Sequence, residues 1–506
     1  MSRWYITVSI PYVNAAPHVG YALELIQADA LARSHRQAGN EVRFLAGTDD
    51  HALKNVIAAE AAGLAPTELV AANGDRFFGL AQALGITFDD FIRTSSDVRH
   101  APGVVRLWRQ TAERGDFYRN FYEGQYCVGC EQFYAAGDLI DGCCPEHTTT
   151  TEWVSEENWF FKLSHYADQI IEAITSGTMT IEPESYRNEA LAFLASGVQD
   201  ISVSRSQRRA RGWGIAVPDD PDQVIYVWWD ALANYVTALG YGTHDGAFQK
   251  WWLDADERVH VIGKGILRFH AVYWPALLLS AGLPLPTRLY VHPYLTVDGA
   301  KISKSAGNGP DPAGLVDVYG ADALRWWMCH EVPRNTDADF SVERLVARAN
   351  EDLANGLGNL VSRVATMVIR FRGGAIPEVT GPLDAELEQL QQSAAALEQI
   401  VRQRIDTFDF RGATLSITEV VGSLNRYIER VQPWRLARDE NDQPPAGPHE
   451  LDQVLGLLAR AVEQVAGAAT PLIPEGVERL HQQIGGSGVV VPPTFPRLEV
   501  EAPRST

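Results

Sequence analysis

The chain has 506 residues, of which 46% are hydrophobic, and this is enough apolar content for two or three domains with their own cores. The formal net charge of −21 argues against a general nucleic-acid binder, although a local basic groove can lie on an acidic protein. No apolar run approaches the ~20 residues that a membrane span requires. The stretch Trp4–Val13 is too short and too interrupted for a signal peptide, and we expect no membrane partner. Four of the five cysteines lie within residues 127–144 and suit a metal site better than a disulfide framework, so we expect a reducing, cytoplasmic location.

The first part of the chain, residues 1–115, alternates strand and helix patterns. An apolar, β-prone run at Trp4–Pro11 precedes a helical pattern at Tyr21–Gly39. A second strand is predicted at Val42–Gly47, and helical periodicity resumes at Leu53–Ala62. This alternation predicts an α/β, doubly wound domain. It returns in residues 221–345, where strands are predicted at Gln223–Trp228, His260–Gly263 and Arg288–Val291.

Residues 116–220 lack the strand–helix alternation of the flanking segments and are predicted to be an insertion that carries a metal site. Cys127, Cys130, Cys144 and His147 follow the pattern C-x2-C-x13-C-x2-H, which is typical of two zinc knuckles. Cys143 competes with Cys144, but only Cys144 has the two-residue spacing to His147. Reduced cysteines in a core are the alternative, although the surrounding Gly and Pro residues favour knuckle turns. Four protein ligands leave no open position, so the predicted zinc is structural.

From about residue 346 the pattern is almost entirely helical. The runs Leu353–Phe371, Leu383–Phe408 and Leu451–Ala469 predict an α-helical bundle over residues 346–485. The last segment, residues 486–506, is Pro-rich; its part Val489–Thr506 is predicted to be extended, and either packs back on the body or is loose.

Two short motifs lie nearly three hundred residues apart. The first, Pro17-His18-Val19-Gly20-Tyr21, is predicted at a strand-to-helix turn, where helix N–H groups and the dipole favour an anion. The second, Gly299-Ala300-Lys301-Ile302-Ser303-Lys304-Ser305, places two lysines and two serines on one Gly-flanked loop that is suited to a polyphosphate.

This pair of motifs resembles the HIGH and KMSKS signatures of class I aminoacyl-tRNA synthetases. Three further blocks resemble methionyl-tRNA synthetases in particular, over nearly the full length of the chain. They are Ser9-Ile10-Pro11-Tyr12-Val13-Asn14-Ala15-Ala16-Pro17-His18, Tyr226-Val227-Trp228-Trp229-Asp230-Ala231-Leu232, and Ile262-Gly263-Lys264-Gly265-Ile266 through His270.

The resemblance implies roles for individual residues. Asp49 would pair with the ammonium group of methionine, and an aromatic box suits its soft sulfur. The residues implied around the amino acid are Ser9, Ile10, Tyr12, Trp228, Ala231, Leu232, Tyr235, Ile266 and His270. The implied ATP-binding residues are Pro17, His18, Gly20, Tyr21, Lys301, Ser303, Lys304 and Ser305, of which His18, Tyr21, Lys301 and Lys304 would be catalytic.

The resemblance also implies the architecture and the partners. We expect a Rossmann catalytic domain split by a zinc-bearing connective insertion and followed by a helical anticodon-binding domain. Asn359 and Arg363, at i and i+4 on one predicted helix face, would read the CAU anticodon with Trp434. Methionine, ATP with Mg²⁺, and initiator and elongator tRNA(Met) would be the ligands of a monomeric enzyme.

The chain departs from the family pattern at four positions. Tyr21 stands where HIGH has its second histidine, and Gly265 stands where an aspartate is usual. Ala52 and Pro293 each replace a common glycine. Two alternatives therefore stay open: a paralogue that esterifies a small metabolite with an activated amino acid, and a non-catalytic RNA-binding relative.

Overall fold

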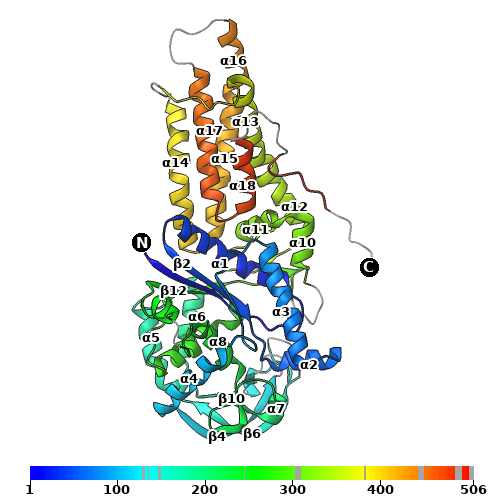
Figure 1. Ribbon diagram of the computed structural model, residues 1–506, viewed down its shortest axis with the longest axis vertical. Coiled ribbons are helices and arrows are strands. Elements are labelled where there is room, and N and C mark those ends of the chain that lie inside the picture. Colours follow the sequence, from blue (N-terminus) through cyan, green and yellow to red (C-terminus); the bar gives the residue numbers. More distant parts are fainter. Residues whose placement is uncertain are drawn as a thin grey trace. The chain divides into compact units, whose positions relative to one another are not determined.

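The computed structural model divides the chain into two compact units, which are labelled by element in Figure 1. The first unit is Met1–Ala28, Gly39–Gln82 and Thr87–His292, and the second is Asp29–Ala38, Ala83–Ile86 and Pro293–Thr506. Within the described part of the chain, no helix combines the length and the apolar character that crossing a membrane demands. The structure describes residues 1–127, 132–134, 136–145, 150–243, 246–302, 309–380, 383, 385–442, 450–484 and 493–500.

A six-stranded sheet with only parallel pairs organises the first unit. Its central strand β1 is fully buried from Tyr5 to Val8, as expected for a parallel sheet that is covered on both faces. The α/β prediction is confirmed, and the edge strand β7 comes from within the segment predicted as an insertion. In sheet order the strands are β3 (Asp90–Arg93), β2 (Glu41–Thr48), β1 (Arg3–Val8), β12 (Glu257–Gly263), β13 (Arg288–His292) and β7 (Thr180–Glu182).

The predicted elements of this unit match the structure in type, except for one predicted strand. The predicted strand Gln223–Trp228 is wrong in its second half, because β11 (Asp220–Ile225) ends early and a helix starts at Val227. The Tyr226 carbonyl accepts the amides of Trp229 and Asp230 at 2.9 and 3.1 Å, which begins that helix. A short apolar run does not distinguish a buried strand from a buried helix. The helices of this part are α1 (Val19–Gln37), α2 (Leu53–Ala62), α3 (Pro66–Ala83), α4 (His100–Glu113), α8 (Val227–Thr237) and α9 (Trp274–Ser280).

The segment predicted as an insertion carries two small antiparallel arrangements. In one, β4 (Phe117–Cys127) pairs along its length with β6 (Glu152–Phe161), with β5 (Gln132–Tyr134) and β8 (Ile201–Ser202) at the edges. In the other, β11 lies between β10 (Ala216–Val217) and β9 (Ser204–Ser206), and is not part of the parallel sheet. The helices here are α5 (Ala167–Thr175), α6 (Glu184–Ala195) and α7 (Gln207–Ala210).

The second unit is mainly helical, and α14, α15 and α17 pack side by side in it (Figure 1). The helical prediction is confirmed, although the predicted helix Leu353–Phe371 is interrupted by a π-helical stretch at Ala349–Gly358 before α13. The small strands are β14 (Leu295–Val297), β15 (Ala300–Lys301) and β16 (Ala338–Asp339). The helices are α10 (Pro312–Tyr319), α11 (Ala321–His330), α12 (Val342–Arg348), α13 (Asn359–Arg372), α14 (Ala385–Asp406), α15 (Phe410–Val431), α16 (Pro433–Asp442), α17 (Glu450–Ala469) and α18 (Pro474–Ile484).

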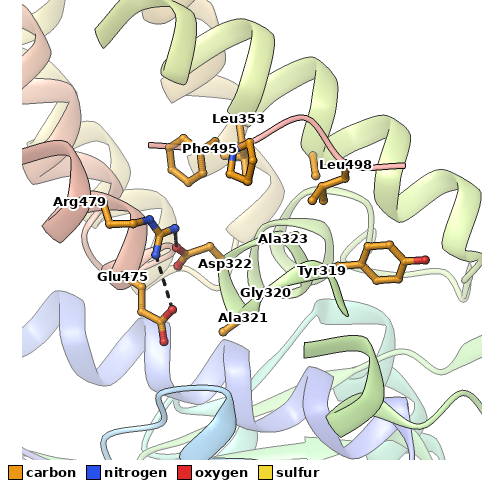
Figure 2. Close-up of a pocket in the computed structure, with 12 residues that line it drawn as sticks. Tyr319, Gly320, Ala321, Asp322, Ala323, Leu353, Glu475, Arg479, Phe495 and Leu498 are labelled. Carbon is orange, nitrogen blue, oxygen red and sulfur yellow. Dashed lines mark hydrogen bonds and ion pairs between the residues drawn. The ribbon is translucent and has the colours of Figure 1, made fainter. Parts of the chain in front are cut away.

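The described part of the C-terminal tail, residues 493–500, packs back onto the helical unit (Figure 2). Phe495 is buried, and Leu498 exchanges two hydrogen bonds of 2.8 Å with the side chain of Asn350. A cavity of about 80 Å³ lies beside these residues, where Arg479 contacts Asp322 at 3.0 Å. The tail therefore contributes to the core of this unit.

Candidate active site

The first part of the site lies where β1 and β2 end, at the carboxyl edge of the parallel sheet. Tyr12 and Asp49 pair there as a single parallel bridge, and the Asp49 amide donates to the Pro11 carbonyl at 2.9 Å. Asp49 is 2% exposed. Ligands of open parallel sheets bind at this edge, so the structure places the predicted ammonium partner Asp49 beside the predicted pocket residue Tyr12.

The turn into α1 holds His18 in a defined tautomer. The Gly20 amide donates to Nδ1 of His18 at 3.1 Å, so a neutral His18 ring carries its hydrogen on Nε2 and can donate from there. Glycine at position 20 leaves room for this ring position, since a Cβ there would lie 2.9 Å from Cε1 of His18 and would displace the ring. The Pro17–Gly20 turn therefore presents a donor at a helix N-terminus, as an anion site needs.

The Tyr21 side chain is buried, whereas a contact with phosphate would require an accessible hydroxyl. Tyr21 is 7% exposed and packs edge-on against Phe77 with ring centroids 5.1 Å apart. Its hydroxyl is closed off from solvent and has no hydrogen-bond partner among the described residues. Burial raises the pKa of Tyr21, so the phenol is neutral. The predicted role of Tyr21 stays a prediction.

Helix α8 supplies one wall of the predicted amino-acid pocket. Ala231, Leu232 and Tyr235 are buried, each 4% exposed or less. Trp228 is half-buried and stacks on Phe269 with ring centroids 3.6 Å apart and an interplanar angle of 12°. The ring of Tyr12 is 6.3 Å from that of Trp228. Ile10, Leu232, Tyr235, Trp228 and Ile266 pack in the same apolar cluster, so most of the predicted pocket residues lie together.

The polar element of this pocket is a fixed Tyr–His pair. The Tyr235 hydroxyl lies 2.7 Å from Nε2 of His270, and Nδ1 of His270 lies 3.0 Å from the Ile266 carbonyl. Because a carbonyl only accepts, Nδ1 carries the hydrogen and Nε2 accepts from Tyr235. Burial lowers the pKa of His270 to about 4, so its ring is neutral at pH 7. His270 lies in a π-helical turn, Phe269–Tyr273, a feature that is frequent at functional sites.

Glu24 on α1 is a buried polar residue that the sequence did not single out. One of its oxygens accepts from the amide and the hydroxyl of Ser9 at 2.7 and 2.6 Å. The other lies 3.0 Å from Nε2 of His292, at the end of β13. Glu24 therefore ties the loop after β1 to the end of β13. Ser9 was predicted near the substrate, and in the structure it holds this carboxylate.

Asp230 is a second such residue, one turn before Asn234 on α8. Its carboxylate contacts Nδ1 of His51 at 2.6 Å and Nε2 of His100 at 2.5 Å. Burial acts to raise the pKa of Asp230, but the two histidines hold it well below its usual range. Asp230 stands in the 226–232 block that resembles the family, and His51 lies two residues after Asp49, so the sequence neighbourhood was the available signal for a role.

The lysine–serine motif belongs to the second unit. Strands β14 and β15 form a hairpin whose turn has positive φ at Asp298 (53°) and Gly299 (72°). Asp339 accepts from the Gly299 amide at 2.9 Å and from the Thr296 hydroxyl at 2.7 Å, which fixes the start of the loop. The backbone of Lys301 ends β15, and its side chain is not described. Ser303, Lys304 and Ser305 lie outside the described residues.

Two of the four predicted zinc ligands are described. Cys127 and Cys144 are both fully buried and belong to one small cluster with Tyr134. Ile140 and Cys143 exchange two backbone hydrogen bonds of 2.9 Å across a turn with two successive positive φ angles, and Cys143 is half-exposed. Over the ranges that the structure describes, no three His, Cys, Asp or Glu side chains gather in a way that could hold a metal. Cys130 and His147 lie outside those ranges.

The predicted anticodon residues lie on the helical bundle. Asn359 and Arg363 share one face of α13, where they contact Asn425 and Glu429 of α15 at 3.4 and 3.6 Å. Trp434 is 41% exposed. It is the second residue of α16, which begins with a proline at its first helical position.

Comparisons with known proteins show the family of the chain. The family described as "tRNA synthetases class I (M)" matches residues 4–152 and 138–365. The methionine–tRNA ligase of Caldanaerobacter subterraneus subsp. tengcongensis is 41% identical over 483 residues, which cover 95% of this chain and 74% of that protein. The methionine–tRNA ligase of Streptomyces coelicolor is 39% identical over 494 residues, which cover 95% and 89%.

A solved structure is similar over nearly the whole chain. Mycobacterium tuberculosis methionyl-tRNA synthetase in complex with methionyl-adenylate superposes with a TM-score of 0.90 and 38% identity, covering 98% of this chain and 100% of that one. The family match, the identity to these relatives and this structural similarity show that the chain belongs to the methionine–tRNA ligase family of class I aminoacyl-tRNA synthetases.

Proposed function

We propose that the chain activates methionine with ATP and transfers it to tRNA(Met). The observation that carries this proposal is the arrangement at α8, where Trp228 lies beside Tyr12 and Tyr12 pairs with Asp49. The buried Tyr235–His270 pair of the same helix region is neutral. A thioether is soft and uncharged, so it suits an aromatic pocket with a neutral polar element. A buried carboxylate suits the ammonium group of an amino acid.

The reaction needs no nucleophile from the protein. The methionine carboxylate attacks the α-phosphate of ATP, the α–β phosphoanhydride bond breaks, and pyrophosphate leaves. A 3′-terminal ribose hydroxyl of tRNA then attacks the carbonyl of the adenylate, and AMP leaves. The protein contributes positioning by Asp49 and by the pocket, and donors to the growing phosphate charge. We assign Nε2–H of His18 to that charge, together with Lys301 and Lys304. Mg²⁺ bound to ATP would supply further positive charge to the phosphates.

A structural zinc fits the cysteines that are described. Cys127 and Cys144 are buried in one cluster, whereas Cys143 is half-exposed on its hairpin turn. The difference in burial supports Cys144 over Cys143 as the third ligand. Two thiolates near each other suit a soft cation, and with Cys130 and His147 they would complete a closed site. Elemental analysis should find about one zinc per chain, and Cys127→Ser with Cys144→Ser should remove it. Protein without zinc would contradict the assignment.

Anticodon recognition is proposed for the face that Asn359, Arg363 and Trp434 provide. The polar groups of Asn359 and Arg363 can reach base edges, and the exposed ring of Trp434 can stack on an unpaired base. Glu429 lies five residues before Trp434 along the chain and contacts Arg363, so these side chains share one region of the bundle.

One experiment tests the function as a whole. Pyrophosphate exchange should be measured with each of the twenty amino acids, followed by charging of tRNA(Met) transcripts with a CAU anticodon and with a changed anticodon. We expect methionine-dependent exchange and anticodon-dependent charging. Exchange without charging of any tRNA would indicate a small-molecule acceptor, and no exchange with any amino acid would indicate a non-catalytic relative.

A further inference from the structure

The proposed methionine site is assembled from two separate parts of the first unit. Asp49, on the loop after β2, would take the ammonium group, and α8 carries residues that would surround the side chain. The distance between these two parts decides whether a methionine can satisfy both at once. Among the described residues, a direct hydrogen bond links them, in which Nδ1 of His51 lies 2.6 Å from Oδ2 of Asp230. Ala52 of the same loop also packs in one cluster with Tyr226 and Val227 at the start of α8.

The loop end of this link is also fixed to Asp49. The backbone amide of His51 donates to Oδ1 of Asp49 at 3.2 Å. The side-chain amide of Asn55 donates to the carbonyls of Asp49 and Asp50 at 3.0 and 2.9 Å. A displacement of His51 would therefore move a donor to the carboxylate that is proposed to bind the substrate.

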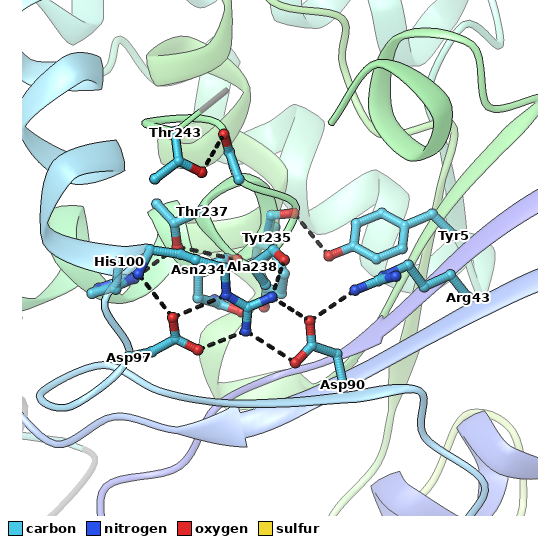
Figure 3. A network of polar contacts seen from close by, with 12 residues as sticks. Tyr5, Arg43, Asp90, Asp97, His100, Asn234, Tyr235, Thr237, Ala238 and Thr243 are labelled. Atoms are coloured by element: carbon cyan, nitrogen blue, oxygen red, sulfur yellow. Dashed lines mark hydrogen bonds and ion pairs between the residues drawn. The ribbon is translucent and has the colours of Figure 1, made fainter. Parts of the chain in front are cut away.

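The helix that carries Asp230 is held by several contacts, and Figure 3 shows those at Tyr235, Thr237 and Ala238. The second oxygen of Asp230 contacts Nε2 of His100, and Nδ1 of His100 lies 2.7 Å from the Thr237 hydroxyl. At the other end of α8, Arg99 donates to the Ala238 carbonyl at 2.7 Å while it also binds Asp90 on β3. The Tyr5 hydroxyl donates to the Tyr235 carbonyl at 2.8 Å. Helix α8 is thus held by several hydrogen bonds, and His51 connects the loop after β2 to it.

We propose that His51 is a positioning residue, which holds Asp49 at the distance from the α8 pocket that the ammonium group of methionine requires. This inference rests on the proposed function and adds a specific role within it. His51 is not a catalytic residue, since it acts through Asp49 and Asp230.

The charge balance around His51 strengthens the link. The charged groups that face it are Asp230 on α8 and Asp50 on its own loop, and the ring of Trp213 packs edge-on at 5.7 Å. Burial acts to lower the pKa of His51, but the two aspartates raise it above its usual value. Protonation adds an ion pair to a hydrogen bond that the neutral ring also makes. The anchor therefore persists across neutral pH.

The test compares two ligands in the full chain. Methionine and 4-(methylthio)butanoate share the thioether and the carboxylate, but only methionine has the ammonium group. His51→Leu removes the donor to Asp230, and His51→Asn retains a donor near the position of Nδ1. Exposed His165, changed to Leu, is the matched control. Binding of both ligands is measured by calorimetry, and KM for methionine and for ATP by pyrophosphate exchange.

We expect His51→Leu to lower the affinity for methionine about tenfold, which corresponds to ~1.4 kcal/mol. The affinity for the amine-free ligand and the KM for ATP should each change by less than about twofold. His51→Asn should recover most of the loss, and His165→Leu should show none. The effects of His51→Leu and Asp49→Asn on methionine affinity should not add, because both act on one contact. Asp230→Asn is the second variant, and it should reproduce the ligand-selective loss if His51→Leu does not fold.

Equal weakening of both ligands, or an equal rise in KM for ATP, would overturn the proposal and indicate a general structural role. Additive effects of His51→Leu and Asp49→Asn would overturn it as well. If the unmodified protein activates no methionine, the proposed function itself fails. That result is separate from a failure of the variants to discriminate between the two ligands.

Discussion

The buried histidine of the amino-acid pocket should make the stability of the protein depend on pH. His270 is fully buried, its Nδ1–H donates to the Ile266 carbonyl, and its Nε2 accepts from Tyr235. A second proton would have to displace the Tyr235 hydrogen bond at Nε2. Burial lowers the pKa of His270 from 6.5 to about 4, so the folded protein resists this proton.

The sign and the size of the effect follow from linkage. Between pH 6.5 and 4 the unfolded chain binds the proton on residue 270 and the folded chain does not, so stability falls as the pH falls. The full effect is about 3 kcal/mol, and about 2 kcal/mol of it should be lost by pH 5, from ~1.4 kcal/mol per pKa unit. Above pH 6.5 the contribution is fully present.

His270→Gln removes the titrating ring and retains an acceptor and a donor. The free energy of unfolding of both proteins is measured by urea unfolding, followed by circular dichroism, at pH 7 and pH 5. From pH 7 to pH 5 we expect the unmodified protein to lose about 2 kcal/mol more of this free energy than the variant loses. His165→Gln, at an exposed position, controls for the change of residue type. Parallel pH dependences of the unmodified protein and His270→Gln would refute the argument, because His270 would then titrate alike in both states.

Four further outcomes are expected in the assays of exchange and charging. Gly20→Ala should slow pyrophosphate exchange more than it lowers the affinity for methionine, because the new Cβ would lie 2.9 Å from the His18 ring. An unchanged exchange rate would contradict this. Tyr21→Phe should leave exchange nearly unaltered, since the hydroxyl is closed off from solvent, and a large loss would mean that it reaches substrate. Lys304→Ala should cost roughly 3 kcal/mol in adenylate formation with little effect on methionine binding. Trp434→Ala should lower kcat/KM for tRNA charging by an amount that corresponds to ~1–3 kcal/mol, as loss of one stacked base would, and should leave pyrophosphate exchange unchanged. Equal losses in both assays would contradict it.

The sequence predicted those features that depend on local patterns. Periodicity was sufficient for the parallel sheet and for the long helices, and motif resemblance brought together Tyr12, Trp228 and His270. The run Gln223–Trp228 failed because an apolar stretch fits either a buried strand or the first turn of a buried helix. Only the tertiary structure decides that Val227 begins α8.

The polar partners of the site were harder to predict, because they are joined by the fold and not by spacing. Glu24 contacts His292 across 268 positions, and Asp230 contacts His51 across 179. No periodicity within one element can report such pairs. A buried carboxylate on a predicted amphipathic helix is the available signal, but it does not name its partner.

The structure also changes how the departure at Tyr21 should be interpreted. A tyrosine in place of the second signature histidine suggests a substitute phosphate donor, but the ring packs against Phe77 and the hydroxyl is closed off from solvent. The amide of Tyr21 is also engaged, since it donates to the His18 carbonyl at 2.9 Å. At this turn the side-chain donor toward an anion is therefore Nε2–H of His18, whose orientation depends on the Gly20 amide. Because the Tyr21 hydroxyl is closed off, we assign Lys301 and Lys304 to the remaining charge on the phosphates, and Lys304→Ala tests that assignment.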